Sequence, residues 1–160
     1  MLSQVYAQSL QMPLIIARPF NHVGIGQSDG FVVPSFVAQI QKTLQGVQSE
    51  LRVGNLDAER DFLDVRDVVR AYILLMEKGI TGEIYNIASG QTIKIRELLE
   101  ILMHEAGCTA PVVQDIARLR PNEVLRIVGS SKKLEDLGWK PSFDVRETLR
   151  EIMRKDTLHL

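Results

Sequence analysis

The sequence predicts an α/β fold, and two observations support this prediction. Short runs of β-branched residues alternate along the chain with longer segments whose apolar residues recur at helical spacing. The chain has 160 residues, enough to bury a sizeable core, and no internal repeat or low-complexity linker breaks the alternation. Alternating strands and helices are typical of sheets whose strands run parallel.

Strands are expected where short apolar runs stand between turn-forming residues. The run PLIIA at 13–17 is the clearest, because it is short and rich in β-branched residues. Similar runs predict strands at 50–54, 83–89 and 111–114.

The strongest helical pattern lies between Asp64 and Gly79. Asp64 is a good N-cap, apolar residues follow at helical spacing from Val65 to Met76, and Gly79 ends the helix. The same periodicity predicts further helices over 2–10, 33–44, 95–107, 130–138 and 144–152.

Composition and charge exclude several classes of function. The formal net charge of −1 offers no basic surface for nucleic acid and no polybasic patch for a membrane. No apolar run approaches the roughly 20 residues of a membrane span, and the N-terminus lacks a signal-peptide pattern. The single cysteine, Cys108, excludes an internal disulfide. We therefore expect a cytoplasmic protein that binds neither nucleic acid nor membrane.

The glycine-rich stretch GIGQSDG at 24–30 stands between a strand and a helix, as phosphate-binding turns do. A dinucleotide fingerprint has the spacing G-x-G-x-x-G directly at the strand end. Here the spacing is G-x-G-x-x-x-G, and residues 18–23 separate the first glycine from the strand. No lysine follows the glycines, as a P-loop requires. The spacing therefore favours an ordinary turn without a ligand.

Polar residues just before these glycines are better candidates for a ligand site. Arg18, Asn21 and His22 are expected beyond the carboxyl end of the strand at 13–17, where open α/β sheets bind ligands. Asn21 can donate to a phosphate or sugar oxygen, and His22 can donate or accept. The alternative is a loop whose polar side chains bond to its own backbone.

One other pair suggests a metal site. His104 and Cys108 stand four positions apart near a helix end, as metal ligands can. Nothing nearby in the sequence supplies a third ligand, so we expect no metal site.

The remaining charged pairs fit structural roles. Asp64 and Asp67 could form a carboxylate pair but suit helix capping better than acid–base chemistry. Arg66 and Arg70 are expected on a solvated helix face. Trp139, between a glycine and a proline, is expected to be a packed anchor after a helix.

The order of five segments resembles that of a known family. The segments are RPFNHVGIGQSDGFVVPSFVAQI, VGNLDAERDFLDVRDVVRAY, GEIYNIASG, LRPNEV and SKKLEDLGWKP. They resemble the extended short-chain dehydrogenase/reductases of the NAD-dependent epimerase/dehydratase family, which act on nucleotide sugars. Within it they are most similar to GDP-6-deoxy-4-keto-D-mannose reductases, with GDP-mannose 4,6-dehydratases as near relatives. The resemblance runs over essentially the whole chain.

The resemblance covers only the C-terminal half of such an enzyme. The family begins with a glycine-rich NADP-binding turn and carries a catalytic Tyr-x-x-x-Lys pair before RPFNH, and this chain contains neither. The resemblance therefore implies that this chain carries no catalytic residue. It also implies that the partner of the chain is either the missing N-terminal half or a second copy. It also implies that 1–30 and 61–90 form the last sheet strands of the Rossmann part, and that 31–60 and 91–160 are mainly substrate-binding.

The resemblance assigns roles to residues near the glycines. It implies that Phe20 lies near the nicotinamide of NADP, that Asn21 contacts the nucleotide-sugar diphosphate, and that His22 lies by the cofactor. The reductases usually carry proline where Ile25 stands here. The dehydratases carry a cofactor-binding arginine near the position of Gln27, and its absence favours a reductase.

Arginines of two other segments match family residues that bind the substrate diphosphate. Arg60 is one, and its guanidinium fork suits phosphate oxygens. The alternative for Arg60 is a surface salt bridge with Glu59 or Asp61. The motif RPNE supplies the substrate-binding residues Arg120, Pro121, Asn122 and Glu123. By this resemblance Arg120 is the second diphosphate-binding arginine, and Glu123 accepts hydrogen bonds from sugar hydroxyls. The alternative is that RPNE is a plain turn.

The implied activity is hydride transfer from NADPH to the C4 ketone of a GDP-6-deoxyhexose, which forms GDP-D-rhamnose. This chain would supply most of the substrate pocket. The alternatives are the corresponding half of a GDP-mannose 4,6-dehydratase, a lyase, or a nucleotide-sugar-binding module without catalysis. Whether the chain is itself an enzyme stays open, and we expect no turnover from it alone.

Overall fold

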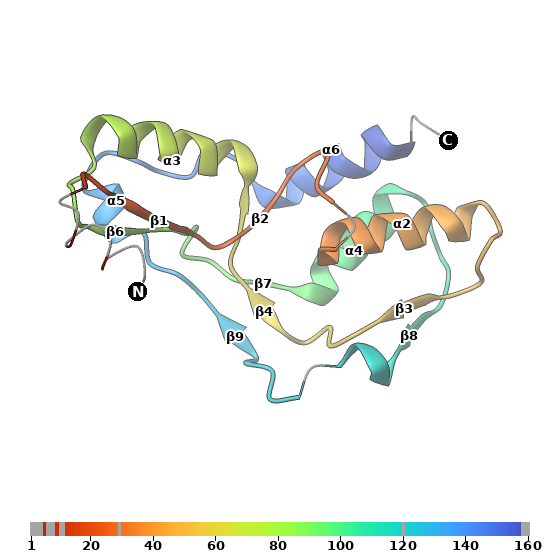
Figure 1. The fold of residues 1–160 in the computed structure, drawn as a ribbon. Helices are drawn as coiled ribbons and strands as arrows, with labels where there is room; N and C mark the ends of the chain where they lie inside the picture. The colour runs from red at the N-terminus through yellow and green to blue at the C-terminus, as the bar shows by residue number, and fades with distance from the viewer. Residues whose placement is uncertain (1–4, 6–8, 10–11, 29, 120, 158–160) are drawn as a thin grey trace.

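The computed structural model describes residues 5, 9, 12–28, 30–119 and 121–157 (Figure 1). It has the mixed α/β fold that the sequence predicts. The strands are β1 (Ile16–Pro19), β2 (Asn21–Val23), β3 (Leu51–Val53), β4 (Glu59–Arg60), β5 (Phe62–Asp64), β6 (Ile84–Ile87), β7 (Ile93–Lys94), β8 (Val112–Gln114) and β9 (Arg126–Ile127). The helices are α2 (Val32–Leu44), α3 (Val65–Lys78), α4 (Ile95–Glu105), the 3-10 turn η1 (Ile116–Arg118), α5 (Lys132–Glu135) and α6 (Val145–Thr157).

Short ladders join distant parts of the chain. β1 pairs with β6, β2 with β5 and β3 with β8, all in parallel. β4 lies between β7, which is antiparallel to it, and β9, which is parallel. Figure 1 shows β1, β6, α3 and α5 at one end of the molecule, α2, α4 and α6 at the other, and β4, β7 and β9 between them.

Apolar packing forms two cores that correspond to these two ends. The larger core holds α2, α4 and α6 together through residues such as Ile40, Leu102 and Met153, each 0% exposed. The smaller core packs α3 and α5 on β6, with Ile87 and Leu134 fully buried. Burial of these side chains is the main favourable term for both ends.

Most predicted elements are confirmed, with ends that differ by a few residues. The predicted strands at 50–54, 83–89 and 111–114 correspond to β3, β6 and β8, and the predicted helices after 33 correspond to α2 to α6. The helix predicted over 2–10 falls mostly outside the described residues. Within the described residues, no helix is long and apolar enough to cross a membrane.

The prediction for the first strand is wrong in position. β1 runs over Ile16–Pro19, so Arg18 lies inside the strand and pairs in register with Asn86, and does not follow the strand. Asn21 and His22 are also not in a loop, because they form β2 beside β5. The chain leaves one ladder for the next at Phe20, whose N–H donates to Ile87 O at 2.9 Å.

Asp64 caps α3, as predicted, and also connects the helix to α6. Its Oδ1 accepts from the backbone N–H of Arg66 at 2.6 Å, and its Oδ2 accepts from Thr148 Oγ1 at 2.7 Å. Burial of this carboxyl raises its pKa, but the hydrogen bonds from Arg66 and Thr148 outweigh burial and hold the pKa below its ordinary value.

Asp67 does not cap a helix, contrary to the sequence prediction. Its carboxylate, 0% exposed, accepts from the backbone N–H groups of Ser142 and Phe143 at 2.9–3.0 Å. The buried Trp139 is confirmed as an anchor, because its Nε1 donates to Asp67 O at 3.1 Å. These bonds fix the segment that leads into α6 against α3.

The two arginines on α3 are not simply solvated. Arg66 pairs with Asp64 and with Glu151 on α6, and its guanidinium lies 4.0 Å from the centre of the Phe143 ring. Arg70 pairs with Asp67 at 2.6 Å. Both arginines are exposed, as predicted for a solvated helix face, with side chains 43% and 47% exposed, and the structure adds these ion pairs to the prediction.

Candidate functional site

A cavity of about 670 Å³ opens where four segments of the chain meet. These segments are the β1–β2 connection, Gln27 with the start of α2, the β4–β5 strands in the middle of Figure 1, and the stretch 121–127 before and within β9. The predicted site residues that line it are Phe20, Asn21, His22, Arg60, Pro121, Asn122 and Glu123. Arg120 lies outside the described residues. Every described residue of the predicted site therefore faces one cavity.

Arg60 is held on the cavity wall by three hydrogen bonds. Its Nη2 donates to Glu123 Oε1 at 3.0 Å, and its Nη1 donates to the backbone oxygens of Glu59 at 2.9 Å and Leu125 at 3.2 Å. The side chain is only 15% exposed. The alternative prediction, a surface salt bridge with Glu59 or Asp61, is wrong because the carboxylate partner is Glu123, another predicted site residue.

Glu123 bridges Arg60 to a second part of the site. Its Oε2 accepts from Asn55 Nδ2 at 2.9 Å while Oε1 accepts from Arg60. The guanidinium and the carboxylate neutralise each other in this arrangement. An anionic ligand that binds Arg60 therefore competes with Glu123 for the same N–H groups.

Pro121 and Asn122 form a turn, and together with Glu123 they line the cavity. Asn122 has a φ of +58°, in the left-handed region that asparagine tolerates better than most residues. The residues after it run beside β4, where Glu59 N donates to Leu125 O at 2.6 Å. The two interpretations of RPNE, a turn or a site, are thus compatible.

Asn21 and His22 make hydrogen bonds to backbone groups. Asn21 Nδ2 donates to Asp61 O at 3.1 Å, across to the β4–β5 junction. His22 Nδ1 lies 3.0 Å from Phe20 O, and since a carbonyl only accepts, Nδ1 carries the proton in this contact. The bond of Asn21 fixes β2 against the strand that follows Arg60.

The glycine-rich stretch turns the chain from β2 to α2, as expected. Gly26 has a φ of +85°, and Gln27 Nε2 donates to His22 O at 3.1 Å across the turn. A Cβ on Gly24 would lie 2.4 Å from Val65 Cγ1, so this glycine allows close packing on α3. These observations give Gly24 and Gly26 structural roles in the turn.

A second cavity, of about 490 Å³, adjoins the first. Asn21, Arg60, Phe62 and Glu123 line both, so the Arg60–Glu123 pair stands on their shared border. Two polar residues of the second cavity, Asn55 and Arg118, were not predicted from the sequence; their chemistry shows only once the fold brings them beside Glu123. Asp61, buried next to Arg60, was also missed as part of the site, although ERDF contains it.

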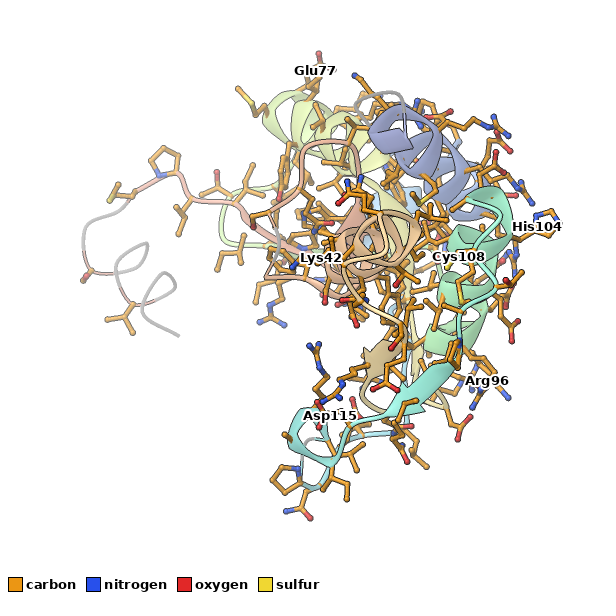
Figure 2. All side chains as sticks on the ribbon, turned by 90° about the vertical axis from the view of Figure 1, so that its right-hand side faces the viewer. Lys42, Glu77, Arg96, His104, Cys108 and Asp115 are labelled. Carbon is orange, nitrogen blue, oxygen red and sulfur yellow. The ribbon has the colours of Figure 1, made fainter. Side chains whose placement is uncertain are left out.

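His104 and Cys108 do not form a ligand pair. Figure 2 shows His104 extending outward from α4, while Cys108 is buried at 7% exposure. Within the part of the chain that the structure describes, no group of three or more histidine, cysteine or acidic side chains could hold a metal ion.

Several curated proteins are similar to this chain in sequence. A GDP-6-deoxy-D-mannose reductase from Pseudomonas aeruginosa is 47% identical over 142 residues, which cover 88% of this chain and 47% of the relative. A GDP-mannose 4,6-dehydratase from Sinorhizobium fredii is 28% identical and is matched over 46% of its length. The chain thus spans about half the length of the curated relatives it matches.

Solved structures share the fold. The structure of RMD from Pseudomonas aeruginosa complexed with NADPH matches with a TM-score of 0.88 and 41% identity over 99% of this chain and 53% of that one. DesIV, a dTDP-glucose 4,6-dehydratase from Streptomyces venezuelae with NAD and TYD bound, matches with a TM-score of 0.80 and 27% identity over 96% of this chain and 46% of that one. The sequence also matches the GDP-mannose 4,6 dehydratase family over residues 1–152. The chain therefore belongs to the GDP-mannose 4,6 dehydratase family, among the extended short-chain dehydrogenase/reductases.

Proposed function

We propose that this chain is the nucleotide-sugar-binding half of an NADP-dependent GDP-6-deoxy-4-keto-D-mannose reductase. One observation carries the proposal: all described residues that the family resemblance assigns to the site line one cavity, although they come from segments 40 to 100 positions apart. A GDP-6-deoxy-D-mannose reductase at 47% identity supports the choice of substrate.

In this proposal Arg60 binds the diphosphate of the GDP-sugar. A guanidinium forms two parallel hydrogen bonds with phosphate oxygens, and the low exposure of Arg60 strengthens them. Glu123, released from Arg60 by the ligand, accepts from ribose or sugar hydroxyls. Arg120, outside the described residues, is the proposed second arginine of the diphosphate site.

The described residues of this chain suit only the nicotinamide end of the cofactor. Phe20 and His22 line the cavity and suit the nicotinamide end of NADP, whereas Arg60 is the one cation among the described residues that line it. We propose that the phosphates of the cofactor need residues from elsewhere. RMD, whose chain is about twice as long, is a solved relative complexed with NADPH. When bound, NADPH supplies the hydride that reduces the C4 ketone.

We also propose the division of the chain that the resemblance implies, with 1–30 and 61–90 in the Rossmann part and the rest mainly in the substrate part. The partner is the other half of the enzyme, or a second copy. The outer face of α3 supports such a partner, because Val69, Ile73 and Met76 are 49%, 53% and 86% exposed. The reaction is proposed to take place in the cytoplasm.

Titration of the purified chain with nucleotides tests the proposal. We expect GDP and GDP-mannose to bind, UDP and dTDP to bind more weakly, and NADPH to give no reduction of the ketosugar. Equal binding of all the nucleotides would contradict a GDP-specific site. Turnover by the 160-residue chain alone would contradict its assignment as a half.

A second candidate is the same half of a GDP-mannose 4,6-dehydratase, since the family match carries that description. Product analysis of a full-length protein that contains this chain distinguishes the two. A reductase converts the 4-keto sugar to GDP-D-rhamnose with NADPH. A dehydratase converts GDP-mannose to the 4-keto sugar with no net use of reductant.

A further inference from the structure

We propose that Asp61 is a positioning residue of the candidate site, whose carboxylate holds the loop after β6 and the segment after Glu123 in register with Arg60. Asp61 lies between Arg60 and Phe62 but points away from solvent, with 0% exposure. No described residue places a cation on it, and all of its recorded partners are neutral donors. Its carboxylate contacts the loop after β6 and the segment after Glu123, and its backbone oxygen contacts β2.

The first set of contacts is with the loop after β6. Asp61 Oδ1 accepts from Ser89 N at 2.9 Å and Ser89 Oγ at 2.7 Å, and Oδ2 accepts from Gly90 N at 3.0 Å. These bonds tie the end of the β1–β6 ladder to the strand residue next to Arg60. A loop with a left-handed Gly90, at a φ of +77°, is thereby fixed.

The second contact is with the segment that carries Glu123. Asp61 Oδ2 also accepts from Gly129 N at 3.1 Å, and Asp61 N donates to Ile127 O at 3.0 Å. Gly129 sits close under Phe20, because a Cβ there would lie 2.7 Å from the Phe20 ring. Asp61 therefore fixes the register of the segment that brings Glu123 to Arg60.

The third contact is with β2. The backbone oxygen of Asp61 accepts from Asn21 Nδ2 at 3.1 Å. Asp61 thus bonds to β2, to the loop after β6 and to the segment after Glu123, while its neighbour in the chain is Arg60. Four N–H and O–H donors converge on this buried carboxylate, and none of them is charged. Only a side chain that accepts at both of its terminal atoms can satisfy all four donors.

Asp61→Asn tests this role, because it keeps the shape and replaces one acceptor oxygen by a donor. Its NH₂ group would face donors on either side, so at least one of the bonds to Ser89, Gly90 or Gly129 breaks. Asp67→Asn is the control: Asp67 is equally buried and also accepts from backbone N–H groups, but these belong to the segment before α6, and its ion pair is with Arg70 on α3 and not with a site residue.

Two readouts follow on the 160-residue chain, and the second rests on the proposed function. The side-chain N–H resonances of Arg60, assigned by comparison with Arg60→Lys, should move in Asp61→Asn and stay in place in Asp67→Asn. GDP should bind Asp61→Asn about tenfold more weakly than wild type, and Asp67→Asn with unchanged affinity. The double variant Asp61→Asn, Arg60→Ala should bind no more weakly than Arg60→Ala alone.

The inference is overturned if Asp61→Asn lowers the melting temperature but leaves the Arg60 resonances and the GDP affinity at their wild-type values. It is also overturned if the losses in GDP-binding free energy caused by Asp61→Asn and by Arg60→Ala are additive in the double variant. If wild type binds no GDP, the proposed function fails, and the Arg60 resonances still decide the role of Asp61. If Asp61→Asn does not fold, Ser89→Ala removes one donor, and Arg60 resonances unmoved in that variant overturn the inference.

Discussion

The helical end of the molecule and the cavity region are stabilised by different interactions. α2, α4 and α6 pack through fully buried apolar side chains, whereas the cavity is bounded by strands of two to four residues joined by polar contacts. Apolar packing tolerates changes in polarity at its surface but not loss of volume. A cavity assembled from single hydrogen bonds is sensitive to the loss of one donor or acceptor. The two regions should therefore respond to different substitutions.

Loss of volume in the helical core should have the largest effect on stability. Leu102 on α4 is 0% exposed, and Leu102→Ala should lower the free energy of unfolding by about 2–5 kcal/mol. Urea denaturation followed by circular dichroism measures this. The GDP affinity of the folded variant should equal that of wild type. A loss of affinity in the folded variant would mean that the two regions are not independent.

The capping carboxylate Asp64 should have a smaller and pH-dependent effect. Asp64→Asn should cost about 2 kcal/mol at neutral pH, because the charge that accepts from Arg66 and Thr148 is removed. The folded-state pKa of Asp64 is below 3.8, so this stability is present above that value and is lost as pH falls through the lowered pKa. Denaturation midpoints measured across this pH range give the difference in stability between wild type and Asp64→Asn.

The difference in stability between wild type and Asp64→Asn should be constant at mildly acidic and neutral pH and should shrink below about pH 3.8. A difference that keeps its full size under strongly acidic conditions would contradict the role given to the ionised carboxylate.

Loss of one buried hydrogen bond should have the smallest effect. Trp139→Phe keeps most of the packing but leaves Asp67 O without the Nε1 donor, at a cost of about 1 kcal/mol. For a chain of this size, the melting temperature should fall by about 2–4 °C. Circular dichroism is the appropriate method, because the substitution removes Trp139, the only tryptophan, and with it the tryptophan fluorescence signal. An unchanged melting temperature would show that the bond contributes nothing.

The sequence predicted the helices and the strands β3, β6 and β8 because their signals are local. Asp64 and Gly79 mark the ends of α3 whatever the rest of the chain does. β2, β4, β7 and β9 have two or three residues each, too few for a pattern, and they exist through partners far along the chain. Asn21 and His22 follow β1 as predicted, but their place in β2 was missed because of this limit.

The described residues predicted for the site line one cavity, but the contacts among them could not be predicted from the sequence. Family motifs identified Arg60 and Glu123, and both line the same cavity. No spacing rule indicates that they bond to each other across 63 positions, or that Asp61 would collect donors from Ser89 and Gly129. Such contacts depend on the register of β4 with β9, which only the folded chain defines.

The central claim is that the cavity around Arg60 binds the diphosphate of a GDP-sugar, and calorimetric titration of GDP into wild type and Arg60→Ala tests it most directly. Arg96→Ala is the control, because Arg96 projects from α4 in Figure 2 and pairs with the exposed Asp57. We predict that GDP binds wild type and Arg96→Ala equally, and Arg60→Ala at least about tenfold more weakly. Equal affinity of Arg60→Ala and wild type, or no binding by wild type, would contradict the claim.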